Sequence, residues 1–136
     1  MITSRFKLGI LTVCAGILAS SAFAGDALRA PSGHEMTFQT VSYLDADGGL
    51  SAHFQFLWPA ILEVELQAEM AMTEGDTLFF CQHFASPYLQ AAGINAARVG
   101  ISFSDQPIEF GVAMPDAVQV FESYALNDGI CEWEAF

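Results

Sequence analysis

The chain has 136 residues, and its 16 acidic residues against 4 Lys and Arg give a formal net charge of −12. At this length we expect one small domain, which excludes a multidomain enzyme and a multispan membrane protein. With 53% hydrophobic and 15% charged residues the chain is too apolar to be disordered, and without a glycine-rich phosphate motif it is not a dinucleotide enzyme of the usual build.

The first 24 residues have the organisation of a secretory signal peptide. Arg5 and Lys7 form a short basic start, residues 8–18 form an apolar run, and an A-x-A pattern ends at Ala24. Because the apolar run is too short for a membrane anchor, we expect cleavage near Ala24. The mature chain, residues 25–136, is then a single domain that is periplasmic or secreted.

The acidic charge belongs entirely to the part of the chain after the predicted cleavage site. Residues 25–136 contain all 16 acidic residues but only Arg29 and Arg98 as basic residues, a balance of −14. Binding to nucleic acid or to an anionic membrane depends on clustered Lys and Arg, so we expect neither as a partner. The charge favours solubility outside the cell, or alternatively attraction of cations or of a basic partner.

Two cysteines, Cys81 and Cys131, lie in the predicted mature chain. An even number of cysteines in an oxidising compartment predicts a disulfide. Closing a loop of about 50 residues stabilises a fold by about 4 kcal/mol in the chain-entropy model. The alternative is a nucleophilic Cys81 beside His83, which is disfavoured because residues two apart on a helix point in different directions.

The first half of the predicted domain has the pattern of a β-hairpin. Residues 36–44 are rich in β-branched and aromatic side chains, residues 45–49 supply a turn, and apolar and polar residues alternate over 50–58. Residues 61–70 fit both a strand and a helix, and both possibilities remain open.

The second half combines one main helix with further strands. The helix is expected from an N-cap at Thr73 to a stop at Gly93, with Pro87 kinking its last turn. In the last strand Cys131 and Trp133 share one face, so the disulfide would join the helix to the core face of the sheet. Strands are predicted at residues 99–103, 108–110, 120–126 and 130–136, with a single helical turn at 115–116 and a hairpin turn at 127–129.

These elements predict an α+β fold with a single disulfide. We expect an antiparallel sheet of about four to six strands with one main helix packed on one face.

Three segments carry a resemblance to a protein family. They are Cys81 followed by Pro87-Tyr88-Leu89, an S-D-x-P-x-E-F-G motif at residues 104–111, and a C-x-W-E-x-F motif at residues 131–136. With this pattern the chain resembles a family of small exported proteobacterial proteins of unknown function. Some similar proteins carry the name acetolactate synthase, although a thiamine-diphosphate enzyme of that kind needs several large domains. The resemblance therefore implies no chemistry and no cofactor.

Few residues stand at the spacing that catalysis or metal binding requires. His34, His53 and His83 show no close ligand spacing, and no serine lies in a G-x-S-x-G elbow. We therefore predict no catalytic residue, no metal site and no cofactor.

Asp105 and Glu109 are the candidates for ligand binding. Asp105 belongs to a turn that the sheet geometry itself requires, but its carboxylate can also face a ligand at the rim of the sheet, and Glu109 of the short strand that follows is expected to border the same groove. The groove expected for such a ligand lies between the helix and the hairpin ends and is lined by aromatic side chains.

The sequence thus predicts an uncharacterised, exported acidic protein that acts as a non-catalytic binding or interaction module of the cell envelope. Its partner, a protein or a small molecule, is not identified by any motif. The alternative is a small hydrolase or metal-dependent enzyme that uses His53, His83 and nearby carboxylates.

Overall fold

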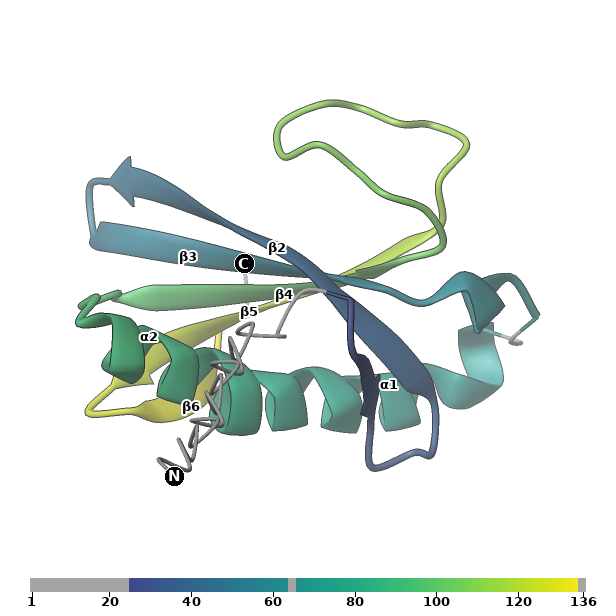
Figure 1. Cartoon of the computed structure of the whole chain (residues 1–136), viewed down its shortest axis with the longest axis horizontal. Helices are drawn as coiled ribbons and strands as arrows, with labels where there is room; N and C mark the ends of the chain where they lie inside the picture. Colours follow the sequence, from purple (N-terminus) through teal and green to yellow (C-terminus); the bar gives the residue numbers. More distant parts are fainter. Residues whose placement is uncertain (1–24, 64–65, 135–136) are drawn as a thin grey trace, which may run out of the picture.

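A computed structural model describes residues 25–63 and 66–134 (Figure 1). The predicted signal peptide and its cleavage site lie outside the described residues. Among the described residues, six strands form one sheet in the order of the chain. The strands are β1 (Ala27–Arg29), β2 (Glu35–Ala46), β3 (Gly49–Leu57), β4 (Arg98–Ser104), β5 (Gln119–Asn127) and β6 (Ile130–Trp133). The helical segments are η1 (Pro59–Glu63), α1 (Leu66–Phe80), η2 (Cys81–Ala85) and α2 (Ser86–Ala92).

The sheet is mixed because one of its strand pairs is parallel. Strands β3 and β4 run side by side from the pair Ser51 and Arg98 to the pair Leu57 and Ser104, whereas the other neighbours are antiparallel. The α+β class, the number of strands and the single helical layer confirm the sequence prediction. The prediction of an antiparallel sheet is wrong at this pair. The chain between β3 and β4 passes through all the described helices, and after such a crossover the second strand runs parallel to the first.

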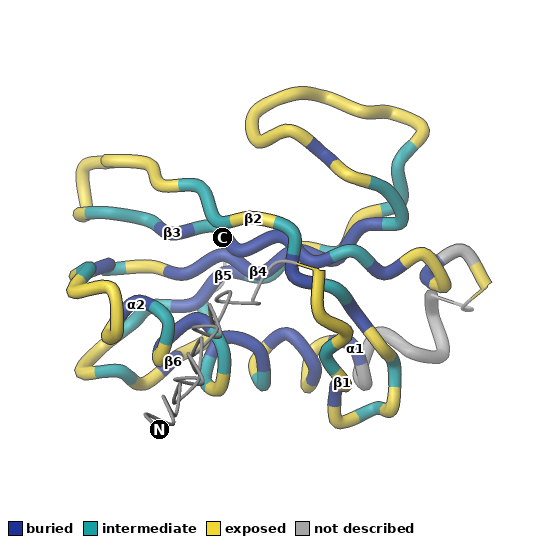
Figure 2. The backbone as a smooth tube through the Cα atoms, viewed as in Figure 1, coloured by how far each residue is buried: buried dark blue, intermediate teal, exposed yellow. Residues whose placement is uncertain are grey.

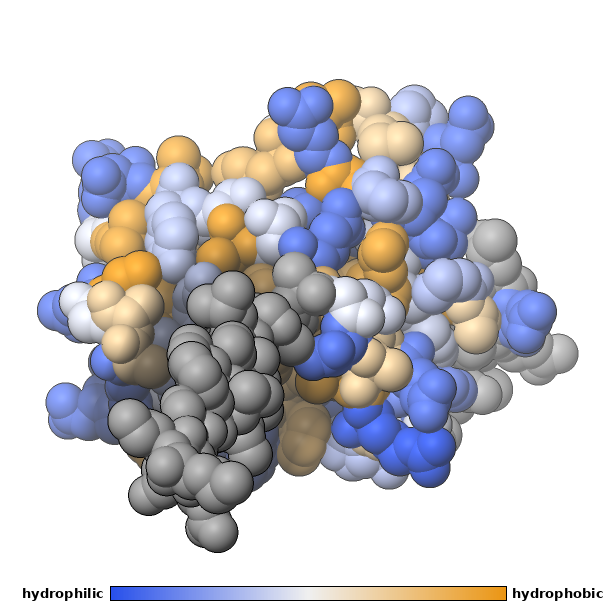
Figure 3. Space-filling model, in the orientation of Figure 1, coloured by the Kyte–Doolittle hydropathy of each residue, from blue (hydrophilic) through white to orange (hydrophobic). Residues whose placement is uncertain are grey.

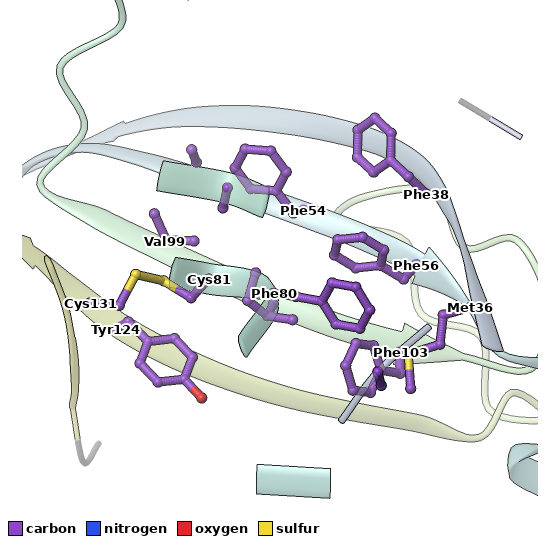
Figure 4. Packing of buried hydrophobic residues seen from close by; sticks show 14 of the residues in the cluster. Met36, Phe38, Phe54, Phe56, Phe80, Cys81, Val99, Phe103, Tyr124 and Cys131 are labelled. Atoms are coloured by element: carbon purple, nitrogen blue, oxygen red, sulfur yellow. A yellow bond between two sulfur atoms is a disulfide. The ribbon is translucent and has the colours of Figure 1, made fainter. Parts of the chain in front are cut away.

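The core lies between the sheet and the helices, and alternation along β3 determines which residues enter it. Ala52, Phe54 and Phe56 are completely buried on the helix side, as the alternating pattern predicts. Among them, Phe56 meets Phe80 from α1 and Phe103 from β4 (Figure 4). Each aromatic side chain buried in this way contributes about 1.5–3 kcal/mol relative to an exposed one.

The helical layer begins earlier than the sequence predicts. The open segment 61–70 is helical on both sides of the two undescribed residues, because η1 ends at Glu63 and α1 begins at Leu66. Thr73 therefore lies inside α1 and does not cap its start, so the predicted N-cap is wrong. The residues from Leu66 to Met72 are strong helix formers, which explains the earlier start.

Pro87 disturbs the helix one turn ahead of its own position. Residues Cys81–Ala85 form a π-helical turn, and α2 begins directly after it with Pro87 in its first turn. Because Pro87 has no N–H to donate to the preceding turn, the irregularity that the sequence predicts appears there.

The disulfide confirms the predicted link between the helical layer and the last strand. Cys81 and Cys131 are bonded, with their Cα atoms 6.3 Å apart (Figure 4). Next to it, Gln82 donates its side-chain amide to the Gly129 carbonyl (2.8 Å) and accepts from the Cys131 N–H (2.9 Å). The Ser86 hydroxyl donates to the same Gly129 carbonyl (2.8 Å), so the β5–β6 hairpin is fixed to the helices at several points.

The segment between β4 and β5 forms neither of the elements predicted for it. Residues 108–110 are not a strand, and residues 115–116 form a turn but no helix. Strand β4 already pairs with β3 and β5 on its two edges, so the sheet offers residues 108–110 no free partner there. Among the helices that the structure describes, none is long and apolar enough to cross a membrane.

Candidate functional site

The long segment of residues 105–118, which we call the roof loop, lies over the face of the sheet opposite the helices (Figure 1). Asp105 closes its base, because its side-chain Oδ1 accepts from the Val118 N–H (2.8 Å) and its own N–H donates to the Val118 carbonyl (3.1 Å). The Ser104 hydroxyl donates to the Gln106 carbonyl (2.9 Å) at the same end. The two ends of the roof loop are thus held together, and the segment between them projects outward.

The roof loop exposes most of its length and carries several hydrophobic side chains (Figure 2). Phe110, Val112 and Met114 are 43%, 49% and 37% exposed, whereas Ile108 is buried. These four residues occupy alternate positions of the loop. In the space-filling view, hydrophobic surface appears over this loop at the top of the molecule (Figure 3). Exposed apolar surface of this kind is typical of a binding site.

Beneath the roof loop, His53 of β3 lies between two aromatic rings. Phe110 of the loop and Phe121 of β5 both meet the imidazole edge-to-face, with ring centroids 5.1 Å and 5.2 Å away. The His53 Nε2 atom is 3.0 Å from the Ser102 hydroxyl oxygen of the neighbouring strand β4. The ring is therefore held by one hydrogen bond and two aromatic contacts from three different segments.

Burial lowers the pKa of His53 from 6.5 to about 4. Removing the ring from water penalises its charged form, because an imidazolium loses hydration that the aromatic neighbours do not replace. At neutral pH the imidazole is therefore uncharged, with one ring nitrogen as a donor and the other as an acceptor.

A hollow of about 220 Å³ opens beside His53. Its walls are mainly apolar and include Leu44, Phe110 and Phe121, and Arg98 lines it from the start of strand β4. Gly100 forms part of the wall, and a Cβ at this position would lie 2.9 Å from the Phe121 ring and 3.4 Å from the His53 ring. Because residue 100 is a glycine without a Cβ, both rings can pack closely against the backbone at this position.

A larger groove, of about 680 Å³, lies between the roof loop and β2. Val112, Met114 and Phe110 line it from the loop, and Gln39 and Thr40 line it from the strand. Gln39 is the extra residue where the register between β2 and β3 shifts. Its side-chain Oε1 is buried with no hydrogen-bond partner among the described residues, so it can accept a hydrogen bond from a molecule bound there.

The two predicted ligand-binding residues both belong to the roof loop. Glu109 is exposed and lines the larger groove, whereas the Asp105 carboxylate is occupied by the Val118 N–H at the base of the loop. The predicted groove between the helix and the hairpin ends is therefore misplaced for these residues, since the roof loop folds to the side away from the helices.

The structure separates the two histidines of the alternative enzyme hypothesis. His53 lies beneath the roof loop, and His83 lies on the helical layer, where its ring centroid is 4.7 Å from that of Phe79. Over residues 25–63 and 66–134, no group of three or more His, Cys, Asp or Glu side chains is placed to hold a metal ion.

The pair of His53 and Ser102 is absent from the sequence prediction because its members are 49 residues apart. Only the parallel register of β3 and β4 brings them together, with Gln55 opposite Ser102. The alternation of the segment 50–58 correctly puts His53 on the face away from the core, but it does not reveal the loop that covers it. The apolar residues at every second position of the roof loop are the signal that indicates such a cover.

Comparison with known proteins gives a family but no function. The model of a family of unknown function, DUF6497, matches residues 13–136. No curated protein sequence and no solved structure matches the chain.

Proposed function

We propose a function for this chain on the premise that it belongs to DUF6497, a family of unknown function. The protein is an exported binding module that takes a small, uncharged, largely apolar molecule into the hollow beneath the roof loop. The observation that carries this proposal is the mainly apolar hollow itself, where a neutral His53 stands between Phe110 and Phe121.

The size of the hollow supports a ligand with one substituted aromatic ring or a short alkyl chain. An apolar cavity of about 150 Å³ accepts benzene, and the hollow beside His53 measures about 220 Å³. Phe110 provides a wall that is partly exposed and belongs to the roof loop. Movement of this loop would admit a ligand without disturbing the core on the other side of the sheet.

The surroundings of His53 favour an uncharged ligand. The same burial that lowers the pKa of His53 to about 4 disfavours any other ion in the hollow. Arg98 lines the hollow, but its Nε donates to Glu134 Oε2 at 2.9 Å, which neutralises much of its charge.

Binding fits the site better than hydrolysis by a Ser102–His53 pair. The Ser102 side chain is only 1% exposed, and the lining of the hollow does not include it. A serine nucleophile has to reach the carbonyl carbon of its substrate, which this position does not allow. The Ser102 hydroxyl therefore orients the imidazole, and His53 forms part of a binding wall.

Export to the periplasm or the medium is part of the proposal. It is supported by the signal-peptide pattern of residues 1–24 and by the disulfide between Cys81 and Cys131. The strongly acidic composition of residues 25–136 argues against nucleic acid and anionic membranes as partners.

The test uses p-cresol as a neutral probe and p-toluate as its charged counterpart. Protein expressed from the full chain is labelled with ¹⁵N and titrated with each compound, and the amide shifts are followed. We expect p-cresol to shift the amides of β3, β4 and the roof loop, and p-toluate to bind at least about tenfold more weakly because its carboxylate loses hydration.

Two variants complete the experiment. Phe110→Ala removes one wall and should weaken p-cresol binding about fivefold, whereas Ile130→Ala, which truncates an exposed apolar residue of the β5–β6 hairpin, should leave it unchanged. Shifts spread over the helical layer, or equal binding by both variants, would overturn the proposal.

A further inference from the structure

Trp133 lies at the end of β6 and is 63% exposed. Strand periodicity puts it on the same face as Cys131, and it lines a groove with residues of α1 on that side, but only Cys131 is buried. Trp133 and Leu78 of α1, which is 43% exposed, line a groove of about 450 Å³ that we call the Trp133 groove. The other residues that line it are Glu74, Gly75, Glu122 and Tyr124.

The indole of Trp133 is fixed in this groove by a hydrogen bond. Its Nε1–H donates to Glu122 Oε2 at 2.8 Å. Tyr124 is buried below, and its hydroxyl is 2.7 Å from the Thr77 hydroxyl. Since the Thr77 hydroxyl donates its only proton to the Glu74 carbonyl (2.9 Å), the Tyr124 hydroxyl donates to Thr77. The groove thus has an ordered floor and one ordered aromatic wall.

Two carboxylates border the groove. Burial raises the pKa of Tyr124, and the negative charges of Glu122 and Glu74 raise it further. Both carboxylates therefore lie close enough to Tyr124, at the floor of the groove, to act on it electrostatically.

No basic side chain of the described residues neutralises these carboxylates. The described part of the chain contains no Lys, and its two arginines pair elsewhere: Arg29 with Glu35 at 3.1 Å, and Arg98 with Glu134 at 2.9 Å. An exposed tryptophan next to two carboxylates that have no Lys or Arg partner among the described residues is complementary to a cation with an apolar stem.

We propose that the Trp133 groove docks an arginine side chain from a basic segment of a partner protein. The guanidinium stacks on the Trp133 indole and pairs with Glu74 and Glu122, while the aliphatic stem lies against Leu78. Arginine fits better than lysine because a planar guanidinium combines stacking with hydrogen bonds to carboxylates. A second copy of this chain is a poor occupant, since both arginines of residues 25–136 already have acidic partners.

In the test, the protein expressed from the full chain is titrated with an acetylated and amidated tetra-arginine peptide, and separately with the matching tetra-citrulline peptide. Citrulline has nearly the same shape as arginine but no charge. We expect the arginine peptide to bind and to shift the Trp133 indole N–H signal, and the citrulline peptide to bind at least about tenfold more weakly. Equal binding of both peptides, or no binding of either, would overturn the proposal.

Variants distinguish the groove from general attraction to an acidic protein. Glu74→Gln with Glu122→Gln should weaken binding of the arginine peptide about tenfold, and Trp133→Leu about fivefold. Asp45→Asn with Asp47→Asn changes the net charge equally at the exposed tip of the β2–β3 hairpin and should alter binding less than about twofold. Equal losses in the two charge variants would show diffuse attraction and contradict the assignment. Binding of p-cresol should be unchanged in all of them, so the two sites are tested separately.

Discussion

Asp76 holds Ser32 with both of its carboxylate oxygens. The Ser32 N–H donates to Oδ1 at 3.1 Å, and the Ser32 hydroxyl donates to Oδ2. Asp76 lies in the middle of α1 and is 1% exposed, and Ser32 is in the turn between β1 and β2. This contact is a polar connection between the helical layer and the turn that follows the short edge strand β1. It also gives the buried carboxylate donors that replace its lost hydration.

Asp76→Asn should reduce the free energy of unfolding by about 1–3 kcal/mol, because the amide places donor hydrogens where the carboxylate accepts. Urea denaturation measures this difference. Asp128→Asn, an exposed change in the β5–β6 turn that asparagine tolerates, is the matched control and should alter stability by less than about 0.5 kcal/mol. An Asp76→Asn protein as stable as the control would show that the contact with Ser32 contributes nothing.

Reduction of the disulfide should destabilise the protein by about 2–5 kcal/mol, since Cys81 and Cys131 close a loop with a sequence separation of 50. The same loss is expected when both cysteines are replaced by serine. Urea denaturation with and without a reductant gives the value, and the double variant should no longer respond to the reductant.

Acidification should destabilise the protein through His53. Its pKa is about 4 in the folded protein and 6.5 in the unfolded chain, so the unfolded state takes up a proton first as the pH falls. The stability contributed by the neutral ring is fully present above pH 6.5 and is lost progressively toward pH 4, by up to about 3 kcal/mol.

The measurement compares urea denaturation of the wild type and of His53→Gln between pH 7 and pH 4. The stability difference between the two proteins should change across this interval in favour of the variant. Parallel pH profiles for wild type and His53→Gln would contradict the effect of burial.

Gly129→Ala should weaken the link between the β5–β6 hairpin and the helices. Gly129 has a φ of +80°, and an added Cβ would lie 2.5 Å from Gln90 Nε2. Gln90 can move aside because it is a flexible exposed side chain, so the main cost is the backbone strain of about 1–2 kcal/mol. The unfolding free energy measures this loss, and Gly75→Ala, where a Cβ meets nothing within 4 Å on an exposed helix position, should instead leave stability unchanged or raise it.

The parts of the fold that depend on local pattern could be predicted from the sequence. The alternation over residues 50–58 correctly identified the buried side of β3, and the cysteine count identified the bond between Cys81 and Cys131. The parallel pairing of β3 with β4 could not be predicted in the same way, because it depends on where a long crossover returns to the sheet.

Most of the candidate site could not be predicted from the sequence either, because it also depends on contacts between segments that are distant in the chain. Ser102 meets His53 through the parallel register, and Phe110 meets it because an irregular loop folds back over the sheet. The apolar residues at alternate positions of the loop indicate a covering segment, but no local pattern shows that it lies over His53. Glu109 was identified as a candidate because it belongs to this loop, but its place on the side away from the helices follows only from the three-dimensional path.

The disulfide also encloses the roof loop in a covalent ring, because residues 105–118 lie between Cys81 and Cys131 in the chain. A protease that cuts the exposed segment near Phe110 would therefore leave two fragments that stay joined through sulfur and through the intact sheet. Such a nicked protein should migrate as one species until a thiol is added. The segment over the hollow can thus be cleaved without the molecule coming apart.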